Sequence, residues 1–190
     1  MAGDEKRVSR AATIRLLASP ARQEIIDTLE ALGGEASVAE LAAQLGRPAD
    51  GLYYHLRLLA RGRVVEEITG AGDARRYRTC ATGGRTRLEY RPGATANAAA
   101  VQRVAASLLR IAGRDFAAAI ARHDVAVEGP QRELWASRLK GWVGDTELAE
   151  INRLLERLTV LLHARRSTRR DRLVSLAWVL APLEERSRDA

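Results

Sequence analysis

The stretch "DGLYYHLRLLARGRVVEE", which runs from Asp50 to Glu67, places two adjacent tyrosines at the start of an apolar run. The chain has 190 residues but only three Trp, four Tyr and one Phe, so this pair needs a physical reason. A helix over residues 49–61, with about 3.6 residues per turn, places three leucines on one stripe: Leu52, Leu56 and Leu59. The stretch therefore predicts a helix that packs against the rest of the chain through its leucines.

The opposite stripe of this helix is polar. It is formed by Asp50, Tyr54, Arg57 and Arg61, and Tyr53 flanks it. In one interpretation, Tyr54 covers the edge of the core and Arg57 is a solvated charge; in the other, both contact a molecule outside the protein. The helix alone leaves these interpretations equal. We expect His55, beside the leucines, to be half-buried and hydrogen-bonded rather than a ligand.

A β-hairpin is predicted directly after the helix. Gly62 ends the helix, residues 64–68 have strand composition, and Gly70 to Asp73 have turn chemistry before a return strand at 74–80. Alternation along the return strand places Arg76 and Arg78 on one face, with Arg75 and Tyr77 on the other. Two basic surfaces would then adjoin the exposed side of the helix, which favours the outward interpretation of the tyrosines.

The segments before this helix are also predicted to be mostly helical. Three elements are expected here: helices at 8–18 and 20–32, and a brief extended piece at 35–36. Ser37 and Glu40 have the spacing of a capping box at the start of a third helix, which Gly46 ends. A helix–turn–helix whose second helix leads into a two-stranded ribbon is the winged-helix arrangement.

The second half of the chain has longer helical patterns. The expected elements are a further short strand within 85–90, helices at 96–124 and 145–164, and an apolar segment at 173–183. The predicted fold is therefore mainly α with a small β-hairpin. A winged helix-turn-helix DNA-binding domain over residues 1–92 would be followed by an all-helical region over 93–190 for dimerisation, with a possible effector site.

Composition limits the classes of function. A net charge of +7 and a pI near 10.4 are compatible with a polyanionic partner. They are equally compatible with an arginine-rich surface that binds no polyanion. Cys80 is the only cysteine, which excludes an internal disulfide and a cysteine-built zinc site. The N-terminus lacks a signal-peptide core, and no stretch reaches about 18 apolar residues, so we expect a cytoplasmic protein.

Catalytic and metal-binding motifs were also sought. The chain has no Gly-rich phosphate loop, nucleophile elbow, HExxH motif or convergent acid pair, so we expect neither an enzyme nor a cofactor. The material for a metal site in the second half is Asp115, His123, Asp124 and His163. Because His123 and Asp124 are adjacent rather than on one helical face, we interpret these residues as surface polar groups and predict no metal.

The segment "LASPARQEIIDTLEALGGEASVAELAAQLGRPADGLYYHLRLLARGRVVEE", followed by "ARRYRTCATG", resembles the ArsR-like winged helix-turn-helix transcriptional regulators over roughly residues 10–85. The resemblance implies a homodimer that binds operator DNA, with repressors the more common kind. It implies a recognition helix at about 49–61 in the major groove and a wing at 63–80 on the flanking backbone. It also implies dimerisation through the helix at 8–18 and part of the helix from Ala96.

The chain departs from the family pattern at two places. The helix before the recognition helix, "SVAELAAQLG", has none of the cysteines that metal-sensing members carry there, and "PADG" lacks the usual Ser or Thr. Recognition of the DNA sequence would then depend more on Tyr53, Tyr54 and Arg57. The predicted DNA-contacting set is Asp50, Tyr53, Tyr54, Arg57, Arg61, Arg75, Arg76 and Arg78. Arg57 is expected to contact a guanine edge, and Arg76 and Arg78 to contact phosphates.

Two alternatives stay open at this level. The winged helix could be an interaction module for protein or RNA partners rather than for operator DNA. In the second half, Trp135, Trp142 and Trp178 could line a small-molecule pocket, although core or dimer packing is the simpler interpretation. The basic segment at 164–172 is expected to be an exposed loop.

Overall fold

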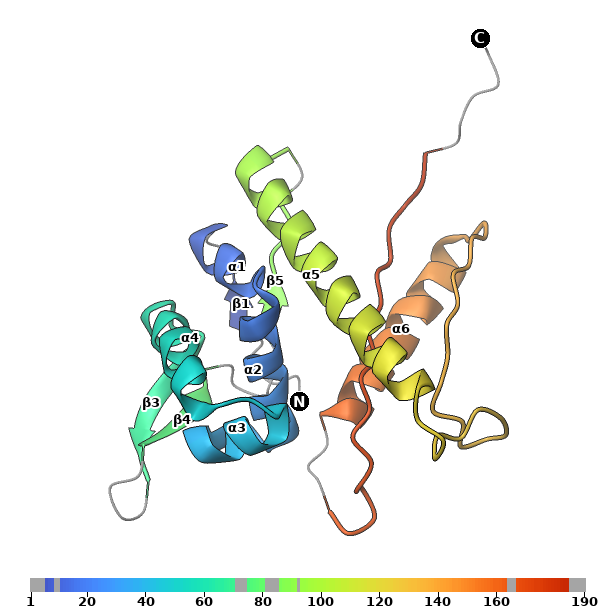
Figure 1. Ribbon diagram of the computed structural model, residues 1–190. Helices are drawn as coiled ribbons and strands as arrows, with labels where there is room; N and C mark the ends of the chain where they lie inside the picture. Colours follow the sequence, from blue (N-terminus) through green and yellow to red (C-terminus); the bar gives the residue numbers. More distant parts are fainter. Residues whose placement is uncertain are drawn as a thin grey trace.

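Eleven elements follow one another in the computed structural model, which describes residues 6–8, 11–70, 75–80, 86–91, 93–163 and 167–184 (Figure 1). The described helices are α1 (Ala11–Leu17), α2 (Pro20–Ala31), α3 (Val38–Leu45), α4 (Ala49–Arg61), α5 (Thr95–Ile120) and α6 (Asp145–Leu162). The described strands are β1 (Lys6–Val8), β2 (Glu35–Ser37), β3 (Val65–Thr69), β4 (Arg75–Thr79) and β5 (Thr86–Leu88). The fold is mainly α with a small β component, as predicted.

The ends of α3 and α4 follow from local chemistry. Ser37 Oγ accepts a hydrogen bond from the Glu40 backbone N–H at 3.2 Å, and Glu40 accepts one from the Ser37 N–H at 2.7 Å, so the predicted capping box is present. Gly46 ends α3 with φ 61°, a left-handed conformation that glycine adopts without strain. Helix α4 has the predicted bounds, and Gly62 is its C-cap.

The sheet is larger than the predicted hairpin. Strands β3 and β4 pair antiparallel, as expected, and β2 adds a third strand in the order β2-β4-β3. The extended piece at 35–36 therefore pairs with a strand about forty residues later, with Ala36 opposite Tyr77. Because β2 runs directly into α3, the sheet and the helix-turn-helix share one covalent junction.

The N-terminal helix is shorter than predicted. Val8 lies in β1, which pairs in parallel with β5, and α1 begins at Ala11 in the described chain. The prediction of a helix from Val8 was wrong because pairing with β5 provides its backbone with a different set of hydrogen-bond partners. The expected strand within 85–90 is present as β5.

One core holds the first half of the chain together. Leu52, Leu56 and Leu59 of α4 are buried. They pack with other buried side chains of the core, which include Ile14, Ile25, Leu29 and Leu41 from the earlier helices and Val65 and Tyr77 from the sheet. Helix α5 contributes Ala100 and Val104 to the same core. Figure 1 shows α5 running beside α1 and α2, from its green start at the top of the view down to its yellow end near α6. Each buried leucine stabilises the fold by about 2–3 kcal/mol through loss of apolar surface from water.

The second half is helical in α5 and α6, and longer irregular segments join and follow these helices. Residues 121–144 and 171–184 contain neither helix nor strand, and α5 ends at Ile120 rather than near 124. Helix α6 has no buried residue. No helix of the described chain is long and apolar enough to cross a membrane.

Candidate nucleic-acid interface

Helix α4 has one buried apolar face and one exposed polar face, as the sequence predicts. Leu52, Leu56 and Leu59 are 2%, 0% and 0% exposed, whereas Asp50, Tyr54, Arg57 and Arg61 are on the exposed side. Tyr54 is 60% exposed and makes an edge-to-face contact with His55 at a centroid distance of 5.3 Å. The interpretation of Tyr54 as a plug at the edge of the core is therefore wrong.

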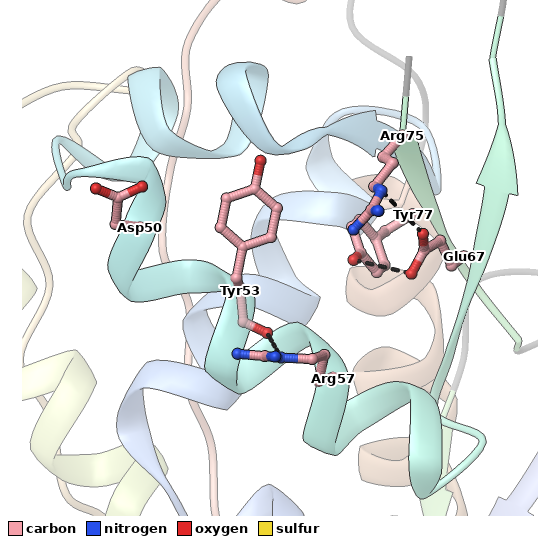
Figure 2. Close-up of a pocket in the computed structure, with 6 residues that line it drawn as sticks. All are labelled: Asp50, Tyr53, Arg57, Glu67, Arg75 and Tyr77. Carbon is pink, nitrogen blue, oxygen red and sulfur yellow. Dashed lines mark hydrogen bonds and ion pairs between the residues drawn. The ribbon is translucent and has the colours of Figure 1, made fainter. Parts of the chain in front are cut away.

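The two tyrosines have different surroundings. Tyr53 is half-buried and packs against the core, and its ring lies over the hollow between α4 and the sheet (Figure 2). Its backbone carbonyl accepts a hydrogen bond of 3.3 Å from Arg57 Nε. Tyr53 therefore helps to anchor the helix to the sheet, while Tyr54 is the tyrosine that a partner can reach.

Helix α4 and the sheet enclose an open hollow of about 430 Å³ (Figure 2). Asp50, Tyr53 and Arg57 line it from α4, and Glu67, Arg75 and Tyr77 line it from β3 and β4. Glu67 joins the two residues of β4, because it accepts a hydrogen bond from the Tyr77 hydroxyl at 3.2 Å and lies 3.5 Å from Arg75 Nε. Four of the predicted contact residues thus meet at one place: Asp50, Tyr53, Arg57 and Arg75.

The other four predicted residues do not line this hollow. Tyr54 and Arg61 lie elsewhere on the exposed side of α4, and Arg76 and Arg78 alternate with Arg75 and Tyr77 along β4. The alternation of the strand was therefore predicted correctly. Tyr77, however, is 1% exposed whereas the Arg75 side chain is 69% exposed, so only the Arg75 end of their shared face is open to a partner.

Every arginine of β4 is paired with a glutamate. Arg75 pairs with Glu67. Arg76 lies 2.8 Å from Glu35 and 3.2 Å from Glu40, and Arg78 lies 2.6 Å from Glu66. Hydrogen bonds to Glu35 and Glu66 raise the pKa of Arg76 and Arg78 respectively. The prediction of two basic surfaces on the wing was wrong, because these carboxylates neutralise much of the charge.

The arginines of α4 differ from those of the wing. Within the described residues, neither Arg57 nor Arg61 forms an ion pair with a carboxylate, and both are exposed. The uncompensated positive charge of this region is therefore on the helix. The glutamates on the wing were missed at the sequence level, although the cross-strand pair of Glu66 and Arg78 is the one that the hairpin register places opposite each other.

The surroundings of α4 also decide the state of His55. This residue is half-buried as predicted, and burial, with Arg22 and Arg47 nearby, lowers its pKa. The imidazole is therefore neutral at pH 7. The predicted hydrogen bond is not made at Nδ1, which has no partner among the described residues.

The candidate metal-site residues of the second half do not converge. Within the described residues, no group of three or more His, Cys, Asp or Glu side chains could hold a metal ion. Asp115 pairs with Arg114, Asp124 pairs with Arg122, and His163 lies 3.2 Å from Glu30. None of the three tryptophans is buried, so the interpretation that they pack in the core of their own chain was wrong.

With this geometry in place, comparison with known proteins identifies one domain. A family model described as a helix-turn-helix domain matches residues 17–68. Residues 17–68 are therefore similar to helix-turn-helix domains. The match extends from the end of α1 through α2, α3 and α4 into β3, which is the part of the chain built around the leucines of α4. No curated protein matches the chain.

A helix-turn-helix domain indicates a DNA-binding regulator, because the second helix of the pair is the element that such domains place in the major groove. In this chain the pair is α3 and α4. Helix α4 carries the exposed Tyr54, together with Arg57 and Arg61, which form no ion pair with a carboxylate among the described residues. The domain and the chemistry of its second helix therefore point to the same partner.

Proposed function

We propose that the protein is a sequence-specific transcriptional regulator of the ArsR-like kind, which binds operator DNA as a homodimer and acts as a repressor. Helix α4 enters the major groove, and the sheet formed by β2, β4 and β3 contacts the flanking backbone. The observation that carries the proposal is the helix-turn-helix match combined with an exposed tyrosine on α4 and two exposed arginines of that helix, which form no ion pair with a carboxylate within the described ranges. The proposal places the protein in the cytoplasm with the DNA and assigns it no catalytic reaction.

The chemistry of the helix supports readout of bases. A guanidinium such as that of Arg57 can donate two hydrogen bonds to the O6 and N7 of guanine, and Asp50 can accept one from the N4 of cytosine. The hydroxyl of Tyr54 can donate to a phosphate or a base edge. These groups are the DNA-contacting residues of the proposal, together with Tyr53 and Arg61.

The wing contributes differently. Ion pairs between exposed side chains are worth about 0–1 kcal/mol, so a phosphate can replace a glutamate as the partner of an exposed arginine. Arg78 and Glu66 are about half exposed, at 51% and 46%, whereas Arg76 is 28% exposed and held by two glutamates. In the proposal, Arg75 and Arg78 therefore exchange their glutamate for a DNA phosphate more readily than Arg76 does.

The test is a fluorescence-anisotropy titration against the DNA upstream of the protein's own gene, accompanied by selection of binding sites from random duplex DNA. We expect Arg57→Ala to weaken binding to the selected site by about 10-fold or more, with the log of affinity falling linearly with the log of salt concentration. Arg110→Ala is the matched control, since Arg110 is also an exposed helical arginine, on α5 rather than α4.

Two outcomes would overturn the proposal. One is an absence of DNA binding at low salt; preferential binding of RNA, or of a protein partner only, would then favour the interaction-module alternative. The other is an equal effect of the two arginine substitutions. A possible small-molecule effector is tested separately by a thermal-shift screen of metals and metabolites, in which a ligand that binds the folded state raises the melting temperature.

A further inference from the structure

The C-terminal part of the chain exposes a large apolar surface. We define the α6 surface as the exposed apolar side chains of that helix: Leu148, Leu154, Leu158, Val160, Leu161 and Leu162, which are 38–62% exposed. Trp142, which is 88% exposed, lies just before the helix. Surface patches of this kind on soluble proteins mark interaction sites.

The solvent-exposed area of the chain is larger than that of a compact monomer of the same mass. The chain exposes 14393 Å². A compact monomer of 20.8 kDa exposes about 9000 Å². The excess is greater than the roughly 1000–2500 Å² that each copy buries in an obligate dimer. Part of this excess belongs to the irregular segments 121–144 and 167–184, and the exposed side chains of α6 contribute to it as well.

The spacing of the apolar residues in α6 fits another helix. Leu148, Ile151, Leu155, Leu158 and Leu162 alternate at steps of three and four residues, which is the heptad spacing of a helix that packs along a second helix. Leu154 and Leu161 broaden this seam on one side. A partner helix with the same pattern would cover the full length of α6.

The charges of α6 favour a second copy of the same helix in the opposite direction. Three of its four carboxylates are near its start, at Asp145, Glu147 and Glu150, whereas its arginines come later, at Arg153 and Arg157. His163 and two further arginines of the sequence, Arg165 and Arg166, follow the helix. Antiparallel pairing places the acidic start of one copy beside the basic end of the other, and it also aligns the helix dipoles favourably.

The surfaces that the family resemblance implies for dimerisation are already covered within one chain. Ile14 and Leu17 of α1 are buried, and so are Ala100 and Val104 of α5, because all four belong to the core of the first half. Helix α6, in contrast, has no buried residue. The segments at 135–143 and 173–183 also expose apolar side chains, but α6 is the described helix on which several of them repeat at helical spacing.

We propose that two copies of this chain associate through the α6 surface, with the two α6 helices antiparallel about a twofold axis near Leu154. The interface is isologous, so Leu148 of one copy lies near Leu162 of the other and the reverse, while Leu154, near the axis, lies close to its own counterpart. His163 at the end of α6 lies 3.2 Å from Glu30 of α2, which connects the interface to the helix-turn-helix domain. The proposal specifies the homodimer of the proposed function, but its test requires no DNA.

The test is the mass of the full chain measured by sedimentation velocity over about 0.5–50 µM, a range that brackets a dissociation constant in the micromolar range. Leu154→Glu places two carboxylates at the twofold axis, and we expect it to raise the dimer dissociation constant by at least about 100-fold. Leu109→Glu is the matched control, since Leu109 of α5 is 53% exposed and Leu154 is 49% exposed. Circular dichroism of each variant verifies that the fold is retained.

The direction of the helices is tested by cross-linking in a Cys80→Ser background. A cysteine in place of Leu154 should cross-link to its counterpart, whereas a cysteine in place of Leu148 should cross-link only when mixed with a chain carrying cysteine at Leu162. Self-cross-linking at both positions would overturn the antiparallel arrangement.

A monomeric wild-type chain, a Leu154→Glu variant that is still dimeric, or equal effects of the two glutamate variants would each overturn the interface. Failure of DNA binding with an intact dimer would instead count against the proposed function alone.

Discussion

Helices α4 and α6 have similar amphipathic patterns and opposite environments. Leu52, Leu56 and Leu59 of α4 are 0–2% exposed, because α2, α3 and the sheet cover them. Most apolar residues of α6 are exposed, and Ile151 and Leu155 are half-buried. An apolar stripe therefore predicts that a helix face will be covered, but it does not predict what covers it. In α4 the cover is the same chain, and in α6 the proposed cover is a second copy.

The largest effect should follow from creating a cavity under α4. Leu56 is fully buried, so Leu56→Ala should lower the free energy of unfolding by about 2–5 kcal/mol, as measured by urea denaturation. Leu154→Ala on α6 should change it by less than about 1 kcal/mol when the protein is dilute enough to be monomeric. Similar losses for both variants would break the comparison between the helices.

The exposed side of α4 should respond in DNA binding rather than in stability. Tyr54→Ala should weaken binding to the selected site by about 1–3 kcal/mol, and it should change the free energy of unfolding by no more than about 0.5 kcal/mol. Tyr53→Ala should destabilise the fold more, because Tyr53 packs against the core. Anisotropy titration and urea denaturation of the same two variants measure both quantities. A greater loss of stability for Tyr54→Ala than for Tyr53→Ala would contradict this assignment.

A smaller effect is expected from the acidic partners on the wing. Glu66→Gln should leave Arg78 available to phosphate and increase DNA affinity by about 2–5-fold at low salt, with the gain disappearing at high salt. Glu128→Gln, at an exposed position of the 121–144 segment, removes the same charge and serves as the control. If both substitutions raise the affinity equally, only the net charge of the protein matters and the wing has no specific part.

The smallest effect concerns the contact between α2 and the end of α6. Burial raises the pKa of Glu30 from 4.5 to about 7, despite the opposing effect of His163. The folded state therefore binds this proton more tightly than the unfolded state, and the resulting stabilisation is full below about pH 4.5 and is lost as the pH rises toward 7. Glu30→Gln should flatten that part of the profile of melting temperature against pH. Glu156→Gln, at an exposed position of α6, should leave the profile unchanged.

Local features were predictable from the sequence. The capping box at Ser37, the left-handed Gly46 and the bounds of α4 each depend on residues within one or two turns of the helix. Helical phase placed Tyr54 on the polar stripe, and the adjoining hairpin favoured the exposure that the structure shows. These features need no information about distant parts of the chain.

The features that the sequence left open depend on distant pairing. The third strand requires Ala36 to meet Tyr77, and the neutralisation of Arg76 requires Glu35 and Glu40, all brought together only by the folded topology. Alternation along β4 separated Arg75 and Tyr77 from their neighbours, but it could not show that Tyr77 would be buried, because burial of a strand face depends on what packs against it.

The carboxylate of Glu40 also fixes a distance. It accepts the Ser37 N–H that begins α3, and the same oxygen lies 3.2 Å from Arg76 of the wing. Because β2 passes into α3 without a loop, this carboxylate fastens the sheet to the first helix of the pair at their shared junction. The contact thus helps to hold α3 and β4 together in the protein without DNA. If the domain binds an operator as proposed, the duplex has to fit a helix pair and a wing that are already joined, and the stiffness of the DNA beside the operator then becomes part of what the domain can discriminate.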